Sequence, residues 1–478
     1  MSPARRRRIY KWELDVTVQR QVPWWRRISP PQYFVASFLL IILTGTLGLL
    51  ILPGLYTDER LGPLDALFTA TSSTCVTGLI VVDTATFFTK RGQAWLLLLS
   101  QLGGLGIITF TTLIMAVLGR RMSVRQETLS ASTTEIAPHI DYRRLARDVV
   151  LFTLMIELVG ALLLYVLWVP RFGWRDAIWH ALFQSVSAFC NAGLATFSDS
   201  LMSFQKSPIT LAVIGTLIFA GGIGFLTLEE LYQWGRARRR GRRYRLSVHS
   251  RLVLWTTGIL SLLGWWIFAW LEWNVTMGDL PAWAKLTNTM FMSVAERTAG
   301  FSTIDYSQAT PSTNFLSMIL MTIGGSPGST AGGLKTTTVA LIVLVLWSRL
   351  RGFEAIHIWG RTIPPHAVQH AVWIMVGGGI MVTIGVFFYT VTEMGTPGAD
   401  PGRLERFLQY AFEAISAFNT VGLSMGVTGS LSAAGKWTTI ILMFLGRVGL
   451  TTAAAALILT TPTPIAEFRY AYEDVAVG

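Results

Sequence analysis

Four segments of the chain carry a glycine in a setting suited to binding a monovalent cation. They read TATSSTCVTGLIVVD, QSVSAFCNAGLATFSD, MSVAERTAGFSTID and EAISAFNTVGLSMG, and they align on Gly78, Gly193, Gly300 and Gly422. Glycine lets a strand turn its carbonyl groups inward, because the dihedral angles involved are costly for a residue with a Cβ. A ring of such carbonyls replaces the hydration shell of an ion. The alternative is that these glycines only allow helices to pack closely.

The segment TIGGSPGSTAGGLKTTT (322–338) is a second candidate, because it interrupts one of the most hydrophobic parts of the chain. The apolar stretch 314–348 is longer than the roughly 20 residues that cross a bilayer. Pro327 removes a backbone donor and five glycines weaken a helix, so we expect local unwinding at membrane depth. A simple kink is the alternative. The segment also offers hydroxyls to the freed backbone groups, and Lys335 adds a positive charge.

Arg447 is a further charge inside an apolar stretch. A charge at membrane depth is costly, so it is a functional candidate by default. The alternative is a structural pairing with a carboxylate, for which Glu157 is one candidate. Beside the third glycine segment, Glu296 and Arg297 are a candidate local ion pair.

The sequence offers no foothold for catalysis. It contains no P-loop or HExxH motif, so we expect no enzyme. Cys75 and Cys190 are too few for a disulfide scaffold or a metal cluster, and we expect them to be buried. Three aspartates follow the glycine turns: Asp83, Asp199 and Asp305. They either concentrate cations at an outer mouth or are ordinary solvated loop residues.

The composition indicates that the bilayer is the solvent of these segments. The 478 residues are 52% hydrophobic and only 14% charged, which is more apolar surface than one soluble core uses. Before each aligned glycine lies a semi-apolar stretch, such as LDALFTATSSTCV, that is too short and polar to cross and predicts a re-entrant half-helix. The predicted membrane spans are 34–52, 93–118, 148–169, 208–234, 250–271, 314–348, 368–391 and 436–461.

A second glycine cluster follows each aligned glycine, at Gly103, Gly221, Gly324 and Gly446. Four repeats of span, half-helix, glycine turn and span therefore account for most of the chain. We expect an all-α polytopic membrane protein with eight spans and pseudo-fourfold symmetry. Its expected parts are a basic N-terminus (1–33), repeat 1 (34–118), repeat 2 (148–234), repeat 3 (250–348, with an intramembrane loop at 324–335), repeat 4 (368–461) and a C-terminal tail (462–478).

Basic residues predict the orientation in the membrane. Two thirds of the 39 Lys and Arg residues lie in the termini and in the connections 119–147, 235–251 and 347–366. Cytoplasmic loops carry such an excess, so both termini are expected in the cytoplasm. The first span lacks a small-residue cleavage site, so we do not expect it to be a signal peptide.

The net charge of +12 can be explained without binding to nucleic acid. Most of it lies at Arg236–Arg245, where anionic lipid or a cytosolic partner is expected.

Taken together, these features resemble the Trk/Ktr/HKT superfamily of potassium transporters over roughly residues 30–465. GGSPGSTAGGLKTTT is the most specific element, and the four glycine loops and GRVGLTT accompany it. Trk-type subunits usually carry two more N-terminal spans, so the chain is most similar to the membrane subunit of Ktr systems. The four glycines match the filter glycines of the family, in which a serine at the first position goes with sodium selectivity.

The resemblance implies specific filter and gate residues. The implied filter, with K+ at its glycines, is Val76, Thr77, Gly78, Asn191, Ala192, Gly193, Thr298, Ala299, Gly300, Thr420, Val421 and Gly422. The implied gate, an intramembrane loop beneath the filter with an arginine as barrier or gate partner, is Gly324, Gly325, Ser326, Pro327, Gly328, Ser329, Thr330, Gly332, Gly333, Lys335 and Arg447.

The implied function is potassium uptake in the inner (plasma) membrane of a bacterium. K+ is the transported ion, Na+ stimulates transport in the family, and no nucleotide is expected in this subunit. The resemblance also implies a homodimer on a cytosolic ring of nucleotide-binding, RCK-type (KtrA-like) regulatory subunits. One alternative is a sodium-selective or non-selective relative, and another is a polytopic membrane enzyme or receptor.

Overall fold

The computed structural model describes residues 30–105, 142–393 and 403–457. Most of the predicted N-terminal part (1–33) and the whole predicted tail (462–478) lie outside these ranges. Residues 106–118 and 458–461, which belong to two predicted spans, also lie outside them.

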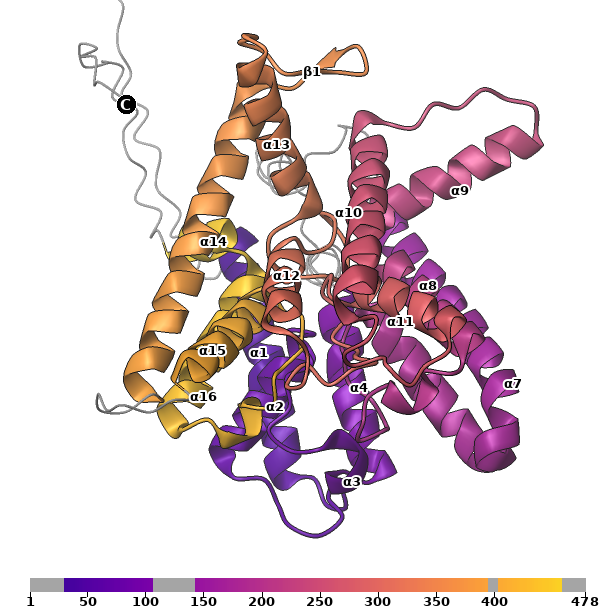
Figure 1. Ribbon diagram of the computed structural model, residues 1–478, viewed down its shortest axis with the longest axis vertical. Helices are drawn as coiled ribbons and strands as arrows, with labels where there is room; N and C mark the ends of the chain where they lie inside the picture. The colour runs from indigo at the N-terminus through magenta and orange to yellow at the C-terminus, as the bar shows by residue number, and fades with distance from the viewer. Residues whose placement is uncertain (1–29, 106–141, 394–402, 458–478) are drawn as a thin grey trace, which may run out of the picture.

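The described chain is mostly helical (Figure 1). Its first part contains α1 (Pro30–Ile51), α2 (Pro63–Thr74), α3 (Thr84–Phe87) and α4 (Lys90–Gly104). Its second part contains α7 (Tyr142–Cys190), η2 (Met202–Phe204), α8 (Pro208–Gly222) and α9 (Phe225–Arg239). Its third part contains α10 (Val248–Glu272), α11 (Ala282–Ala295), α12 (Pro311–Thr322), α13 (Thr336–Leu350) and a hairpin of β1 (His357–Ile358) and β2 (Arg361–Thr362). Its fourth part contains α14 (Pro365–Thr392), α15 (Arg403–Phe418), η3 (Thr428–Ser430), α16 (Ala433–Val448) and α17 (Leu450–Leu457).

Several helices have the length and composition of membrane spans. Within the described ranges, four helices qualify, in α1, α7, α10 and α14, and there are up to six if the bent pairs α8–α9 and α16–α17 each count as one. Large apolar side chains such as Leu43, Trp266 and Trp373 are exposed on their outer faces. A helix that is apolar all round and still exposed needs lipid as its surroundings. The chain is a multi-pass membrane protein.

Two of the predicted spans are bent rather than straight. The stretch 208–234 turns by 105° between α8 and α9, and the stretch 436–461 turns by 95° between α16 and α17. At the bends, Gly224 and Gly449 have φ angles of 88° and 84°. Positive φ ends an α-helix and is tolerated best by glycine, so each bend lies where the sequence supplies that residue. The stretch 314–348 is also interrupted, between α12 and α13, as its proline and glycines predict.

A short helix leads into each of the four glycine loops. These helices are α2, the last part of α7, α11 and α15. The last part of α7 is separated from the preceding long helix by a break at Gly173, where φ is 77° and ψ is 166°. The break lets one continuous run contain both a long apolar helix and a short helix of different direction.

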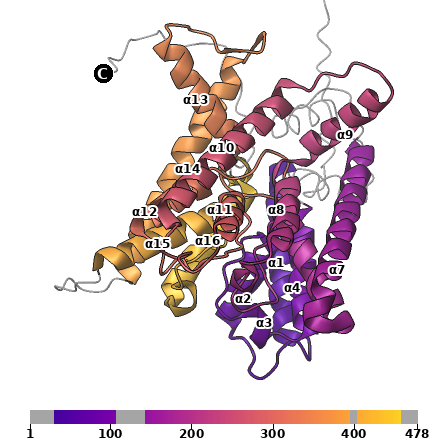
Figure 2. The ribbon, with the colours of Figure 1, turned by 45° about the vertical axis from the view of Figure 1, so that its right-hand side comes forward.

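Four hydrophobic cores join the successive parts of the chain into a closed arrangement. Each core contains side chains from two neighbouring parts: Leu96 with Phe183, Leu217 with Phe291, Met321 with Phe412, and Phe418 with Phe68. The last pair joins the end of the chain to its beginning, and α16 also packs on α2 while α17 packs on α1. Figures 1 and 2 both show α15 and α16 beside the indigo N-terminal helices. The four short helices are thereby held around a common centre.

Candidate functional site

The four aligned glycines lie in loops of the same unusual backbone shape. Gly78, Gly193, Gly300 and Gly422 have φ angles of 90°, 66°, 75° and 93°. The residue two positions earlier is also left-handed in every loop: Val76 (57°), Asn191 (58°), Thr298 (72°) and Thr420 (50°). Left-handed backbone costs a non-glycine residue roughly 1–2 kcal/mol, so four copies of this shape require strong support from their surroundings.

The four glycines form a ring. A Cβ added to Gly78 would lie 3.1 Å from the Cα of Gly193, and one on Gly193 would lie 3.1 Å from the Cα of Gly300. A Cβ on Gly300 would lie 3.4 Å from the Cα of Gly422, and one on Gly422 would lie 3.1 Å from the Cα of Gly78. We call these four residues the glycine ring. The structure therefore brings together the four positions that the sequence pattern singled out.

Main-chain oxygens lie at every junction of the glycine ring. The nearest neighbour of an added Cβ on Gly78 is the carbonyl oxygen of Ala192, and on Gly193 it is that of Ala299. On Gly300 it is the carbonyl oxygen of Val421, and on Gly422 it is that of Thr77. Each oxygen belongs to the residue before the next ring glycine. The ring thus gathers backbone oxygens from four segments, and these are groups that can substitute for water around a cation.

The second set of glycines supports the short helices from the side. A Cβ on Gly103, Gly221 or Gly446 would overlap a carbonyl oxygen at the end of a short helix, namely that of Thr74, Phe189 or Phe418. Each of these oxygens belongs to the residue four positions before a ring glycine. Gly324 differs, because its nearest neighbours are the carbonyl oxygens of Gly332 and Leu334. Close approach of two backbones explains why glycine recurs at these positions.

Serine side chains brace three of the loops, a feature that the sequence analysis missed. Ser72 Oγ accepts from Gly78 N at 3.1 Å and donates to the Leu79 carbonyl at 2.7 Å. Ser187 Oγ donates to the Leu194 carbonyl at 2.6 Å, and Ser416 Oγ accepts from Gly422 N at 3.0 Å. A serine six residues before the glycine was a visible signal in three of the four aligned segments. The third segment has Val294 there.

In the filter that the resemblance implies, replacing Ser72 by alanine is expected to reduce the preference for potassium over sodium about tenfold, because buried groups of the first loop lose hydrogen bonds worth about 1–3 kcal/mol. Potassium uptake into proteoliposomes with and without competing sodium measures the preference. Ser73→Ala is the matched control, since the buried Ser73 Oγ has no hydrogen-bond partner in the described structure. Equal ion preference in the two variants would contradict the bracing role.

A cavity opens above the glycine ring. It has a volume of about 460 Å³, and all four ring glycines contribute to its lining. Asp83 and Asp305 also line it. Asp83 caps α3 by accepting from Ala85 N at 3.0 Å, and Asp305 accepts from Ser307 N at 2.9 Å. Asp199 is not part of the lining and accepts from Ser203 N within its own turn. Two of the three predicted aspartates are thus placed where they can attract cations.

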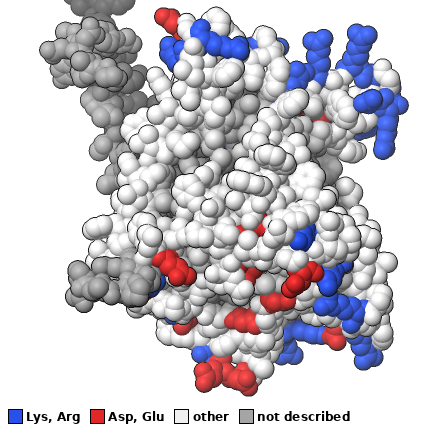
Figure 3. Space-filling model, viewed as in Figure 1, with Lys and Arg blue, Asp and Glu red and all other residues white. Residues whose placement is uncertain are grey.

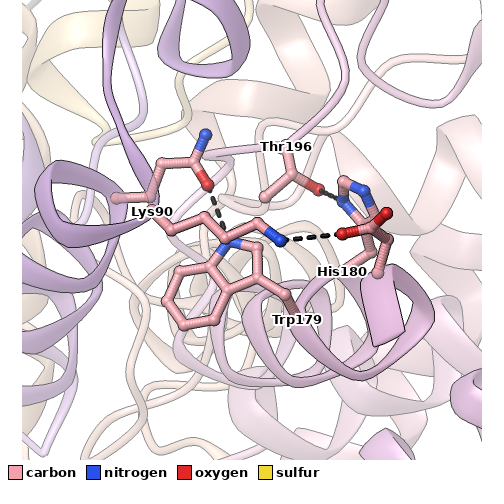
Figure 4. Close-up of polar contacts among 6 residues, drawn as sticks. Lys90, Trp179, His180 and Thr196 are labelled. Atoms are coloured by element: carbon pink, nitrogen blue, oxygen red, sulfur yellow. Dashed lines mark hydrogen bonds and ion pairs between the residues drawn. The ribbon is translucent and has the colours of Figure 1, made fainter. Parts of the chain in front are cut away.

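A set of polar contacts joins the first and second parts of the chain (Figure 4). Three contacts of 2.7 Å are formed: Lys90 Nζ with Asp176 Oδ1, Trp179 Nε1 with Gln93 Oε1, and His180 Nδ1 with Thr196 Oγ1. The first two join α4 to the last part of α7, and the third holds the loop just beyond Gly193. An exposed ion pair contributes little to stability. The hydrogen bonds of Trp179 and His180 therefore do more to fix the position of the last part of α7.

The predicted gate segment lies against the residues that immediately precede the glycine ring. Asn191 Nδ2 donates to Thr330 Oγ1 at 3.0 Å, and Leu334 N donates to Asn419 Oδ1 at 3.3 Å. A Cβ on Gly332 would meet the Thr420 side chain. Backbone bonds also tie the segment to neighbouring helices: Ser326 N to Gly222 O at 2.9 Å, Thr330 N to Gly221 O at 3.2 Å and Gly333 N to Gly446 O at 3.1 Å. We call residues 324–335 the intramembrane loop.

The loop also closes on itself. Gly324 N donates to Leu334 O at 2.9 Å, and Ser329 Oγ donates to Ser326 O at 2.6 Å. Lys335 Nζ donates to the carbonyl oxygens of Ala331 and Gly332, at 2.6 and 3.3 Å. The freed backbone groups of the interrupted helix therefore find partners, as membrane depth requires.

Arg447 joins the intramembrane loop to the first part of the chain. Its guanidinium is buried and donates to the carbonyl oxygens of Thr330 and Gly103. The alternative pairing with Glu157 does not occur, since that carboxylate accepts from Gln101 Nε2 at 3.1 Å. Arg447 therefore places a positive charge directly against the loop, with main-chain oxygens as its partners.

The TrkH family model, described as a cation transport protein, matches residues 29–466. The chain belongs to the TrkH family of cation transport proteins. The predicted resemblance is thereby confirmed at family level. The family consists of transporters, so the expectation that the chain is not an enzyme is confirmed as well.

Individual relatives of this TrkH family chain match nearly its full length. Ktr system potassium uptake protein B of Bacillus subtilis is 37% identical over 428 residues, covering 89% of this chain and 92% of that protein. The potassium/sodium uptake protein NtpJ of Enterococcus hirae is 35% identical over 457 residues, covering 95% and 98%. The crystal structure of the potassium transporter TrkH from Vibrio parahaemolyticus has the same fold, with a TM-score of 0.69 and 19% identity over 90% of this chain and 84% of that one.

One further sequence expectation is wrong, and another is confirmed. Glu296 and Arg297 do not pair. Glu296 accepts from Tyr306 Oη at 2.9 Å, whereas Arg297 Nη2 donates to Thr257 Oγ1 at 3.3 Å. Consecutive residues at a helix end point in different directions, so adjacency in sequence does not make them partners. Cys75 and Cys190 are buried free thiols, as expected.

Proposed function

We propose that the chain is the potassium-translocating subunit of a Ktr-type uptake system. The observation that carries the proposal is the glycine ring, with a backbone oxygen from four separate segments at its junctions. Relatives over nearly the whole chain are named as potassium uptake proteins, which supports K+ as the transported ion. All four ring positions are glycine, in keeping with potassium as the preferred ion.

In this proposal the chain consists of four pseudo-fourfold repeats with eight membrane spans. Each repeat supplies three filter residues: Val76–Gly78, Asn191–Gly193, Thr298–Gly300 and Thr420–Gly422. The short helices end near the ring, so their negative dipole ends help to stabilise a cation there. The cavity lined by Asp83 and Asp305 is the entrance. An inside-negative potential of 100 mV then supplies about 2.3 kcal/mol for each K+ that enters.

The intramembrane loop and Arg447 form the gate. The loop lies against the residues just before the ring, and Arg447 holds it there with a positive charge. Opening requires the loop to leave these contacts. We further propose that the signal comes from a cytosolic RCK-type nucleotide-binding ring on which a homodimer sits, with both termini in the bacterial cytoplasm. Nucleotide would act on that ring, and Na+ would act as a stimulator.

Reconstitution into liposomes tests the proposal. With the cytosolic regulatory subunits present, we expect uptake of potassium that an equal concentration of sodium does not suppress. Without those subunits, uptake is expected to fall. Equal uptake of both ions would favour a non-selective or sodium-selective transporter instead, an alternative supported by the name of the Enterococcus hirae relative, a potassium/sodium uptake protein. Absence of any ion flux would overturn the proposal.

A further inference from the structure

The end of α9 and the turn after it carry an unusual density of positive charge. Seven arginines lie within ten residues, and all are exposed: Arg236, Arg238, Arg239, Arg240, Arg242, Arg243 and Arg245. We call residues 232–245 the arginine arm. Figure 3 shows its blue side chains gathered over α9 at the upper right, away from most of the acidic side chains on that face. Such a concentration of like charge repels itself unless an anionic partner is bound.

The protein does not neutralise this charge itself. In the parts that the structure describes, none of the seven arginines forms an ion pair. The two carboxylates nearest in sequence have other partners. Glu229 Oε1 accepts from Gln233 Nε2 at 3.0 Å, and Glu230 Oε2 accepts from Ser247 N at 3.0 Å. The guanidinium groups therefore remain available for an external anion.

The arm has a defined shape. The chain reverses at Gly241, where φ is 66°, and Arg242 N donates back to the Ala237 carbonyl at 2.9 Å. The returning segment is then attached to α9, because Tyr244 Oη donates to Gln233 Oε1 at 3.1 Å. The backbone that presents the arginines is thus fixed before any ligand binds, which lowers the entropy cost of binding.

The position of the arm is at a membrane boundary. Ser247, two residues after Arg245, caps α10, which is a 25-residue apolar helix long enough to cross. On the other side, α9 leaves α8 at 105°, so it does not continue the direction of that helix. Figure 1 shows the end of α9 projecting beyond the packed helices, with the returning chain joining the start of α10. Arginines next to the end of a membrane-spanning helix lie at the depth of the lipid headgroups.

Aromatic side chains accompany the arginines. Tyr232 is 53% exposed, Trp234 is 37% exposed and Tyr244 is 36% exposed. Arg238 also lies over the Trp234 ring, at 5.3 Å from its centroid. Tyrosine and tryptophan are favoured at the membrane–water interface, where one end of the ring is apolar and the other is wet. A docking site for a soluble acidic protein does not require exposed aromatic side chains beside a spanning helix.

We propose that the arginine arm binds the phosphate groups of anionic phospholipids. The guanidinium fork matches a phosphate bidentately, and the exposed aromatic rings insert beside the headgroups. The inference goes beyond ion translocation, since the arm lies outside the glycine ring and the intramembrane loop.

The test compares lipid binding by the full-length chain and by a charge variant. Native mass spectrometry of the detergent-solubilised protein counts bound phosphatidylglycerol and phosphatidylcholine. In Arg239→Gln/Arg240→Gln/Arg242→Gln/Arg243→Gln we expect phosphatidylglycerol to bind about tenfold more weakly, because each arginine near an anionic headgroup adds to affinity. Phosphatidylcholine binding should be unchanged, which also reports an intact fold. The matched control removes four exposed arginines elsewhere, as Arg60→Gln/Arg91→Gln/Arg171→Gln/Arg175→Gln, and should retain phosphatidylglycerol.

Three results would overturn the proposal. The first is undiminished phosphatidylglycerol binding by the arm variant, which would leave a soluble acidic partner as the better explanation of the charge. The second is an equal loss in the control variant, which would indicate a general effect of net charge. The third is complete displacement of the lipid by millimolar inorganic phosphate, which would indicate a site for a soluble anion.

Discussion

Gly422→Ala should abolish selective potassium uptake, and Gly78→Ala should do the same. At both positions an added Cβ overlaps a carbonyl oxygen of the neighbouring loop, that of Thr77 or Ala192, so the oxygens of the ring must move apart. Gly193→Ala should be milder, because its Cβ would lie 3.1 Å from the Ala299 oxygen. A displacement that costs about 2.7 kcal/mol reduces the preference for potassium about a hundredfold. Uptake of potassium into proteoliposomes at increasing sodium measures the effect.

Gly173→Ala provides the control for backbone strain. Gly173 also has a positive φ of 77°, but an added Cβ there meets nothing within 4 Å. Both kinds of variant place alanine at a positive φ, and only the ring variants add the collision with a neighbouring loop. Ion selectivity should survive in Gly173→Ala. If Gly422→Ala retained it too, the glycine ring would have no part in selecting the ion.

Replacing Arg447 by glutamine is expected to raise potassium flux about tenfold when the regulatory subunits are absent. The arginine donates to Thr330 of the intramembrane loop and to Gly103, and hydrogen bonds from a charged donor contribute about 1.5–3 kcal/mol each. In the proposed gate, their loss weakens the closed position of the loop and removes the positive charge beside the pathway. Flux from liposomes into potassium-free buffer measures the leak.

Arg349→Gln is the matched control, since it removes one exposed arginine in the last turn of α13, at the end of that helix away from the loop. Its flux should equal that of the unaltered protein. Purification of Arg447→Gln as a single species by size-exclusion chromatography checks that the fold persists. A folded Arg447→Gln protein with unaltered or lower flux would contradict the assignment of this arginine to the gate.

The glycine ring could be predicted because its requirements are local. Each loop needs a residue without a Cβ at one position, and the sequence shows that residue after a semi-apolar stretch four times. The interruption between α12 and α13 could be predicted for the same reason, since proline and glycine act on the backbone nearby. The roles of these residues in selection and gating remain proposals, because they depend on an ion and on motion.

Other features could not be read from the sequence. In the sequence, Gly224 and Gly449 cannot be distinguished from other glycines of a membrane helix, because close packing and a positive φ call for the same residue. The partners of Arg447 are main-chain oxygens, which every residue possesses and no motif reveals. The serine braces are different, because their fixed offset before the glycine was visible and was overlooked.

The contact between the two ends of the chain has a consequence for biosynthesis. Phe68 shares a core with Phe418, and α2 packs on α16, so the loop of Gly78 acquires its second neighbour only when the last quarter of the protein has been inserted. Translation proceeds from the N-terminus, so the earlier segments are in the bilayer before their C-terminal packing partners have been synthesised. A prematurely terminated polypeptide therefore cannot complete the proposed conduit. We therefore expect aborted translation products to leave the membrane potential of the cell undisturbed.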